Sequence, residues 1–296
     1  MIKRVDMRVD HVSVAVNEID TALAFFRSAF PLEMRVEKRR GYSDDFNWCD
    51  FYIGQFKLEL IEPTRAHSFV RRFIDKHGEG LHHMSLEVTQ LQPLLEHLEA
   101  DGIRIVDRST AGDGDMTAFI SPRSAHGVLV QFWQTPQITE PERPRTAPLR
   151  LRSGAVVNMR VDHVAIAVRH IDTAMNFFRR YFPVRWGRAP HAGYDGTFFF
   201  SNFLLNGYKI ELLAEQPDQP PGFVSRFLER RGEGLHHISV DVDRLDPLLA
   251  QLEADGVRIV DRTDFSDEIK TAFISPRSAH GVLIQFWQTP FHGEES

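Results

Sequence analysis

Four side chains of types that can bind metal ions recur in register in two copies along this chain of 296 residues. The first copy supplies His11, Glu59, His83 and Gln131, and the second supplies His163, Glu211, His237 and Gln285. Two imidazoles with one carboxylate and one amide oxygen suit a borderline divalent cation such as Co, Ni, Zn, Mn or Fe. On a six-coordinate ion they leave two positions open, so a substrate can chelate the ion through two oxygens and be stabilised as an enolate.

The sequence around these side chains is repeated as well. RVDHV occurs at 8–12 and 160–164, GEGLHH at 78–83 and 232–237, and TAFISPRSAHGVL at 117–129 and 271–283. A single histidine at the start of a strand is more often structural than metal-binding, but four ligand types kept in both copies favour metal sites. The repeat predicts an N-terminal domain over 8–136, a connector over 137–158 and a C-terminal domain over 159–290.

The elements that carry these residues follow one order in each copy. Residues 11–16 alternate as a strand does, and 19–30 have helical apolar spacing with Asp20 as the expected N-cap. Strands are then expected at 46–54 and 56–62. The order recurs as a strand at 82–88, a helix at 91–102, and strands at 103–108, 117–122 and 128–133. Each copy is therefore two β-α-β-β-β modules, and the fold class is α+β with four modules forming two cupped mixed sheets.

In this scheme the four residues occupy matching strand positions. His11 and His83 lie in the first strands of the two modules, while Glu59 and Gln131 lie in the last. Alternation places His83 on the inner face with Ser85 and turns His82 to the other face.

Composition excludes several classes of function. A net charge of -6 and the lack of a Lys/Arg run interleaved with aromatic residues argue against a nucleic-acid partner. No apolar run is long enough to span a bilayer and no secretory signal is evident, so we expect a cytoplasmic protein without a membrane partner. Cys49 is the single cysteine, which excludes an intrachain disulfide and a thiolate metal site.

The series DHV, KLELIEP, GEGLHHMSLEV and ISPRSAHGVLVQFWQ resembles the vicinal oxygen chelate superfamily. That group includes glyoxalase I, methylmalonyl-CoA epimerase, extradiol and 4-hydroxyphenylpyruvate dioxygenases, and antibiotic-resistance binding proteins. The local likeness is strongest to methylmalonyl-CoA epimerase, in GEGLHH and in S-P-R-S-x-x-G-V-L. The resemblance implies tandem domains of that fold with metal ligands at the four positions. The epimerase has Gln at the position of Glu59 and Glu at that of Gln131, so the two are exchanged here and the site charge is unchanged.

The exchange of Glu and Gln also bears on the hypothesis that the protein is a dioxygenase. The tandem dioxygenases that this chain resembles hold iron with two histidines and a Glu in the final strand, where this chain has Gln285. A triad of His163, His237 and Glu211 keeps the two-histidine, one-carboxylate set of non-haem iron enzymes. The position of the carboxylate therefore argues against a dioxygenase but does not exclude one.

An epimerase or isomerase needs a base near the reacting carbon. The acids of the loop at 41–50 are not shared by the second copy, whereas Tyr42 and Tyr194, and His126 and His280, are shared. These four are candidate acid/base residues. Glu59 or Glu211 is a further candidate. The site resembles that of glyoxalase I, and this resemblance implies that the carboxylate ligand can dissociate from the metal and act as the base.

Substrate contacts are expected from two other shared pairs. Arg123 and Arg277 can clamp a carboxylate or phosphate, or equally be exposed turn residues. Trp133 and Trp287 share a face with the Gln ligands and either line a pocket or fill the sheet interior.

We therefore expect a metal-dependent epimerase, isomerase or lyase acting on a small molecule with adjacent oxygens. A non-haem iron dioxygenase is the alternative enzyme, and a small-molecule sequestration protein is the alternative of another class. The two halves are expected to pair as an intrachain pseudo-dimer, and the sequence also allows the chain to form homo-oligomers.

Overall fold

The computed structural model describes residues 5–110, 116–138 and 143–289. Residues 139–142 of the expected connector and residue 290, the end of the expected C-terminal domain, lie outside that range. The N-terminal half contains the strands β1 (Met7–Ala15), β2 (Leu32–Arg40), β3 (Phe46–Ile53), β4 (Phe56–Pro63), β5 (Gly80–Val88), β6 (Ile105–Thr110), β7 (Met116–Ile120) and β8 (Leu129–Gln134). Its helices are α1 (Ile19–Ala29), α2 (Phe69–His77), α3 (Leu91–Ala100) and the 3-10 turn η1 (Pro122–Ser124).

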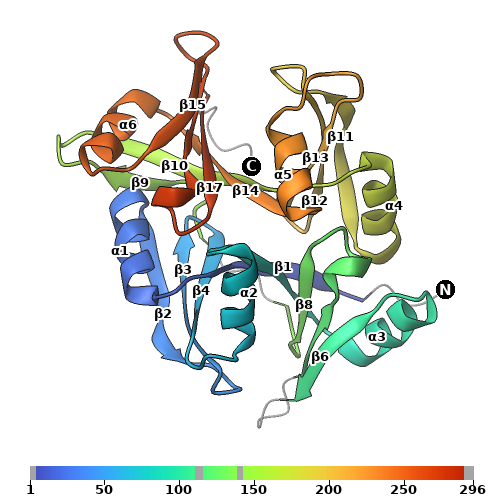
Figure 1. The fold of residues 1–296 in the computed structure, drawn as a ribbon. Coiled ribbons are helices and arrows are strands. Elements are labelled where there is room, and N and C mark those ends of the chain that lie inside the picture. Colours follow the sequence, from blue (N-terminus) through green and yellow to red (C-terminus); the bar gives the residue numbers. More distant parts are fainter. Residues whose placement is uncertain (1–4, 111–115, 139–142, 290–296) are drawn as a thin grey trace. The chain divides into compact units, whose positions relative to one another are not determined.

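The C-terminal half repeats this order (Figure 1). Its strands are β9 (Ala147–Arg150), β10 (Val156–Ala167), β11 (Val184–Ala192), β12 (Phe198–Leu205), β13 (Tyr208–Glu215), β14 (Gly234–Val242), β15 (Ile259–Asp264), β16 (Lys270–Ile274) and β17 (Leu283–Gln288). Its helices are α4 (Ile171–Tyr181), α5 (Phe223–Arg231), α6 (Leu245–Ala254) and the 3-10 turn η2 (Pro276–Ser278).

Each half builds one mixed sheet. The first has the strand order β2-β3-β4-β1-β5-β8-β7-β6, and the second has the equivalent order β11-β12-β13-β10-β14-β17-β16-β15, with β9 added beside β10. Strand β5 runs parallel to β8 and antiparallel pairing joins β3 to β4. The α+β class and the tandem arrangement of β-α-β-β-β modules are confirmed.

The N-cap of helix α1 lies two residues before the expected one. Glu18, in extended conformation, is the N-cap, and Asp20 lies in the first turn. There the carboxylate of Asp20 interacts favourably with the positive end of the helix dipole and accepts a hydrogen bond from Lys38 Nζ at 3.1 Å. The prediction that Asp20 caps the helix was wrong, because the apolar stripe of Ile19, Leu23 and Phe26 starts at the first helical residue.

Helices α2 and α5 are additional to the sequence prediction. In α2, Val70 and Ile74 pack against Ala15 and Ile61, so the helix covers one end of the sheet face formed by β1 and β4. Ser68 caps this helix by accepting a hydrogen bond from Arg71 N at 3.0 Å. Helix α5 covers the equivalent cluster around Ala165 and Leu213.

The chain forms two compact units, and each unit contains segments from both halves of the sequence. One unit holds the described residues within 1–12, 82–140 and 163–236, and the other those within 13–81, 141–162 and 237–296. In the first, Phe132 of β8 stacks on Phe182 at 6.4 Å. In the second, Phe30 lies 6.0 Å from Phe286 of β17. Aromatic contacts between elements of the two halves thus occur within each unit.

The described part of the connector is structured. Arg143 lies over the ring of Tyr52 at 3.8 Å and bonds Glu33 Oε2 at 2.6 Å. A Cβ at Gly54 would lie 2.3 Å from the carbonyl oxygen of Arg145, so only glycine admits the connector there. These contacts hold the connector against the β2-β3-β4 hairpins.

The described helices include none that is both long and apolar enough to cross a membrane.

Candidate metal centres

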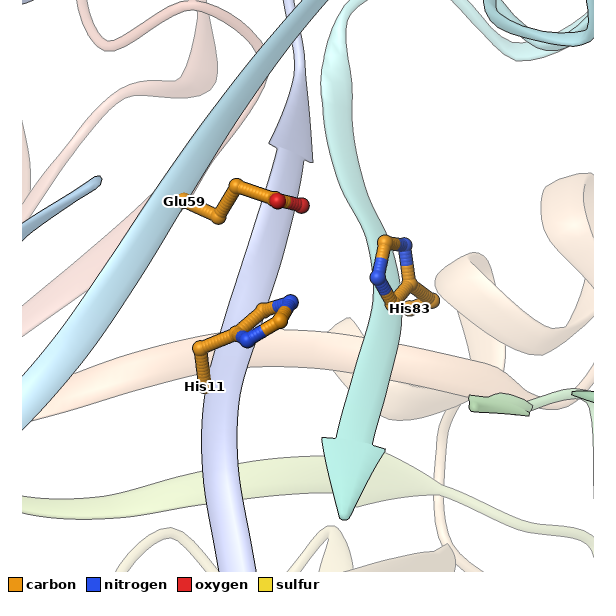
Figure 2. A group of neighbouring side chains, drawn as sticks. All are labelled: His11, Glu59 and His83. Atoms are coloured by element: carbon orange, nitrogen blue, oxygen red, sulfur yellow. The ribbon is translucent and has the colours of Figure 1, made fainter. Parts of the chain in front are cut away.

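The N-terminal half brings three of the predicted ligands together. His11 from β1, Glu59 from β4 and His83 from β5 each offer a ligand atom, and these atoms all lie within 4.8 Å of one another. Figure 2 shows the three side chains pointing toward a common point. Atoms bound to one ion at about 2.1 Å lie about 3–4 Å apart, so this spacing accommodates a single cation.

The fourth predicted ligand, Gln131, adjoins this triad. Its Oε1 lies 3.1 Å from His83 Nε2, a separation typical of neighbouring ligands on one ion. On the other side of the ring, His83 Nδ1 lies 2.8 Å from His82 Nδ1. A metal-binding Nε2 carries no proton, so Nδ1 of His83 donates to His82 in that state. His82 thus fixes the ring of His83 rather than entering the triad.

His11 has a carboxylate partner of the kind that orients metal-bound histidines. Its Nδ1 lies 2.6 Å from Asp10 Oδ2. When Nδ1–H donates to Asp10, Nε2 is left as the lone-pair nitrogen for a metal. Sequence reasoning missed Asp10, although the repeated dipeptide Asp-His was the available signal.

The C-terminal half contains the equivalent triad of His163, Glu211 and His237, whose ligand atoms also lie within 4.8 Å of one another. His163 Nε2 is 3.4 Å from Glu211 Oε1, and the two side chains are 8% and 12% exposed. Burial, together with the charge of Arg231, lowers the pKa of His236 to about 4. His236 is therefore neutral beside His237 at ordinary pH.

Thr117 and Thr271 orient the two glutamines. Gln285 Nε2 donates to Thr271 Oγ1 at 3.4 Å, and that hydroxyl donates to Phe286 O at 2.9 Å. Since the hydroxyl proton is already used, its oxygen accepts from the amide, which turns Gln285 Oε1 away from Thr271. Gln131 Nε2 donates to Thr117 in the same way at 3.3 Å. Neither threonine was foreseen from the sequence, although both are repeated.

The donor set fits a divalent metal ion in both halves. Each triad combines two imidazoles with a carboxylate, and each half orients a glutamine whose oxygen is the remaining neutral donor. His11, His83 and Gln131 would hold the ion in the first half with Glu59. His163, Glu211, His237 and Gln285 are the equivalent residues in the second.

The acid/base histidines proposed from the sequence lie at contacts with the other half. His280 Nδ1 is 3.2 Å from Glu79 Oε2, and its ring lies 6.1 Å from that of Phe25. His126 lies 3.3 Å from Glu233 Oε2. The hydrogen bond from the histidine lowers the pKa of each glutamate. Both histidines adopt positive φ, at 50° and 49°.

The remaining candidate catalytic and substrate-binding residues are exposed or half-buried. Tyr42 and Tyr194 are 54% and 43% exposed and meet Phe46 and Phe198 edge-on. Arg123 and Arg277 are exposed on the turns η1 and η2. Trp133 and Trp287 are half-buried on the strands that carry the glutamines. Their roles stay predictions.

Comparisons with known proteins agree with this fold. The model of the Glyoxalase/Bleomycin resistance protein/Dioxygenase superfamily matches twice, at residues 10–119 and 162–273. An uncharacterized Bacillus subtilis protein, YqjC, is 37% identical over 131 residues, which are 42% of this chain and 90% of that protein. Bovine mitochondrial methylmalonyl-CoA epimerase is 29% identical over 133 residues, 43% of this chain and 74% of the relative.

A solved structure extends the likeness to both halves. A mutant 4-hydroxymandelate synthase from Streptomyces coelicolor matches with a TM-score of 0.63 over 96% of this chain and 92% of its own, at 14% identity. At that identity the match shows a shared fold. With both halves matched by one family model and two sheets in tandem, the chain belongs to the Glyoxalase/Bleomycin resistance protein/Dioxygenase superfamily.

Proposed function

We propose that the protein is a metal-dependent enzyme that binds a small substrate through two adjacent oxygens and catalyses an epimerisation, isomerisation or lyase reaction through an enolate. The observation that carries the proposal is the pair of triads, each with two imidazoles and a carboxylate within 4.8 Å. A bound divalent ion would supply Lewis-acid polarisation of the chelated carbonyl.

The protein groups would orient the substrate and move the proton. With four protein ligands, two positions are left for two substrate oxygens in a six-coordinate arrangement. Glu59 and Glu211 each lie in a triad with the two imidazoles, which supports them as the base. His126, His280, Tyr42 and Tyr194 are the further acid/base candidates, and Arg123, Arg277, Trp133 and Trp287 the candidate substrate contacts.

Relatives support this reaction class. Methylmalonyl-CoA epimerases from cattle and Dictyostelium discoideum are 29% and 30% identical over matching segments. We extend to this chain the use of a small acyl substrate. From the sequence we further propose a cytoplasmic location, the pairing of the halves as a pseudo-dimer, and domains at 8–136 and 159–290 joined by 137–158.

A non-haem iron dioxygenase is the second candidate. His163, Glu211 and His237 form the two-histidine, one-carboxylate set that such enzymes use. The carboxylate comes from β13, while the last strand β17 supplies Gln285. A sequestration protein without turnover is the third, and it predicts tight ligand binding without chemistry.

Solvent deuterium exchange tests the proposal. The metal-loaded protein should catalyse the incorporation of deuterium from D2O into methylmalonyl-CoA or a 2-hydroxy ketone, at a carbon next to a carbonyl. No oxygen should be consumed. The variant Glu59→Gln/Glu211→Gln should lose the exchange. Oxygen uptake with Fe(II) and catechols or 2-oxo acids would favour the dioxygenase, and stoichiometric binding without either reaction would favour sequestration.

A further inference from the structure

The two metal centres differ at the residues that flank the carboxylate ligand. In the C-terminal half, Ala165 of β10 pairs with Glu211, and Asn202 of β12 pairs with it from the other side. In the N-terminal half, Asp50 of β3 pairs with Glu59. Val16 N bonds Ile61 O as Val168 N bonds Leu213 O, so β1 and β4 share the register of β10 and β13. Ser13 therefore takes the place of Ala165.

Ser13 is a buried hydroxyl on the face of the metal ligands. Its residue is 0% exposed, and no group in the described part of the chain bonds its Oγ. Ser13 lies two residues after His11, so both side chains project from the same face of β1. Neighbouring strands are about 4.8 Å apart, which places the hydroxyl beside Glu59. A buried hydroxyl is rarely left unsatisfied, because its desolvation costs free energy.

Asp50 is a buried carboxylate on the other side of Glu59. The residue is 3% exposed, and its Oδ2 accepts a hydrogen bond from Arg35 Nη1 at 2.7 Å. Lys57 Nζ lies 3.9 Å from the same oxygen. Two carboxylates directly opposite on neighbouring strands repel each other, and these two cations offset that repulsion.

The fold does not require this charged group. In the second half Gly187 and Asn202 take the places of Arg35 and Asp50, and a Cβ at Gly187 would lie 2.0 Å from Asn202 Oδ1. The same strands therefore form there without the ion pair. In this pair the Arg35 side chain is 47% exposed and the Asp50 side chain is buried. Such an ion pair brings little net stability, so a structural role alone is a weak reason to retain it.

We propose that the N-terminal half is the half that selects the substrate, and that Ser13 and Asp50 bind a third oxygen of a small acid whose other two oxygens chelate the metal. This rests on the proposed function, because it assumes a chelated substrate at Glu59. A substrate hydroxyl donates to Asp50 or exchanges a hydrogen bond with Ser13. The C-terminal half, with Ala165 and Asn202, binds the same chelating group without that selection.

Lactate and glycerate test this subsite, since both chelate through a carboxylate and a 2-hydroxyl and only glycerate has a further hydroxyl, on C3. Each half is studied alone in Co(II)-loaded full-length protein, with His237→Ala leaving the N-terminal site and His83→Ala leaving the C-terminal one. Calorimetry should show glycerate binding about tenfold more tightly than lactate in the first variant, because one hydrogen bond to a buried polar group is worth about that factor. The second variant should show a ratio near one.

Ser13→Ala in the His237→Ala protein copies the natural Ala165 and should reduce the ratio at least about threefold. Adding Asp50→Asn should bring it close to one. In the His83→Ala protein, Ala165→Ser should raise the ratio. Equal binding of the two acids by the N-terminal half, or a ratio that Ser13→Ala leaves unchanged, overturns the subsite. Failure to bind Co(II) or lactate at either half would instead contradict the proposed function.

Discussion

Removing the charge of Glu79 should weaken the contact between β5's entry loop and the His280 turn. Glu79 Oε1 accepts a hydrogen bond from Asn17 N at 2.6 Å, and Oε2 lies 3.2 Å from His280 Nδ1. The two side chains of the pair are 22% and 17% exposed. Hydrogen bonds to a charged group contribute about 1.5–3 kcal/mol, and Glu79→Gln keeps a neutral acceptor for Asn17, so about 1–2 kcal/mol of the free energy of unfolding should be lost at pH 7.

The pH dependence gives this prediction its sign. The hydrogen bond from His280 lowers the pKa of Glu79, so the folded state favours the carboxylate. The stabilisation is then fully present above the unfolded pKa of about 4.3 and disappears as the pH falls through the lower folded value. Urea unfolding of wild type and Glu79→Gln should differ at pH 7, and the difference should become smaller as the pH is lowered toward 3.

Two variants complete the test. Glu233→Gln should behave like Glu79→Gln, because the pKa of Glu233 is lowered by His126 in the same way. Glu99→Gln removes an ion pair with Arg108 whose side chains are 46% and 43% exposed, and should cost less than about 0.5 kcal/mol. A difference between wild type and Glu79→Gln that is as large at pH 3 as at pH 7, or absent at both, would refute the reasoning.

Three further outcomes follow from the geometry. Thr271→Val removes the acceptor that orients Gln285 and should weaken metal binding at the second site about tenfold, as measured by Co(II) titration, and unchanged affinity would contradict it. Gly281→Ala should cost more than about 2 kcal/mol by urea unfolding, since φ is +78° and the added Cβ would lie 1.7 Å from Glu79 O, and a variant of wild-type stability would exclude that contact. Burial raises the pKa of the Cys49 thiol to about 12, so thiol reagents should label it at pH 8 only after unfolding, and rapid labelling of the native protein would contradict its burial.

The fold and the ligand triads were largely predictable because they follow from local patterns. Strand alternation distinguished His83 from His82, and the repeat identified Glu59 and Glu211 as equivalent. These inferences need the period of a strand and a comparison of two copies of one sequence.

The remaining features depend on contacts between distant segments. The pairing of His126 with Glu233, 107 residues away, has no local signal, and neither does the bond of Gln285 to Thr271 on a neighbouring strand. Helix α2 has apolar residues at helical spacing after Ser68, a signal that was present but not used. The difference between Asp50 and Asn202 was visible in the sequence, but its place beside the carboxylate ligand required the strand register.

The metal content of the protein tests the central claim most directly. Protein purified without chelator and then equilibrated with Co(II) should hold two ions per chain by elemental analysis. His83→Ala and His237→Ala should each hold one, and the double variant none, while far-UV circular dichroism stays that of the folded protein. A wild-type chain that binds no stoichiometric metal, or a folded double variant that still binds two ions, would contradict the account.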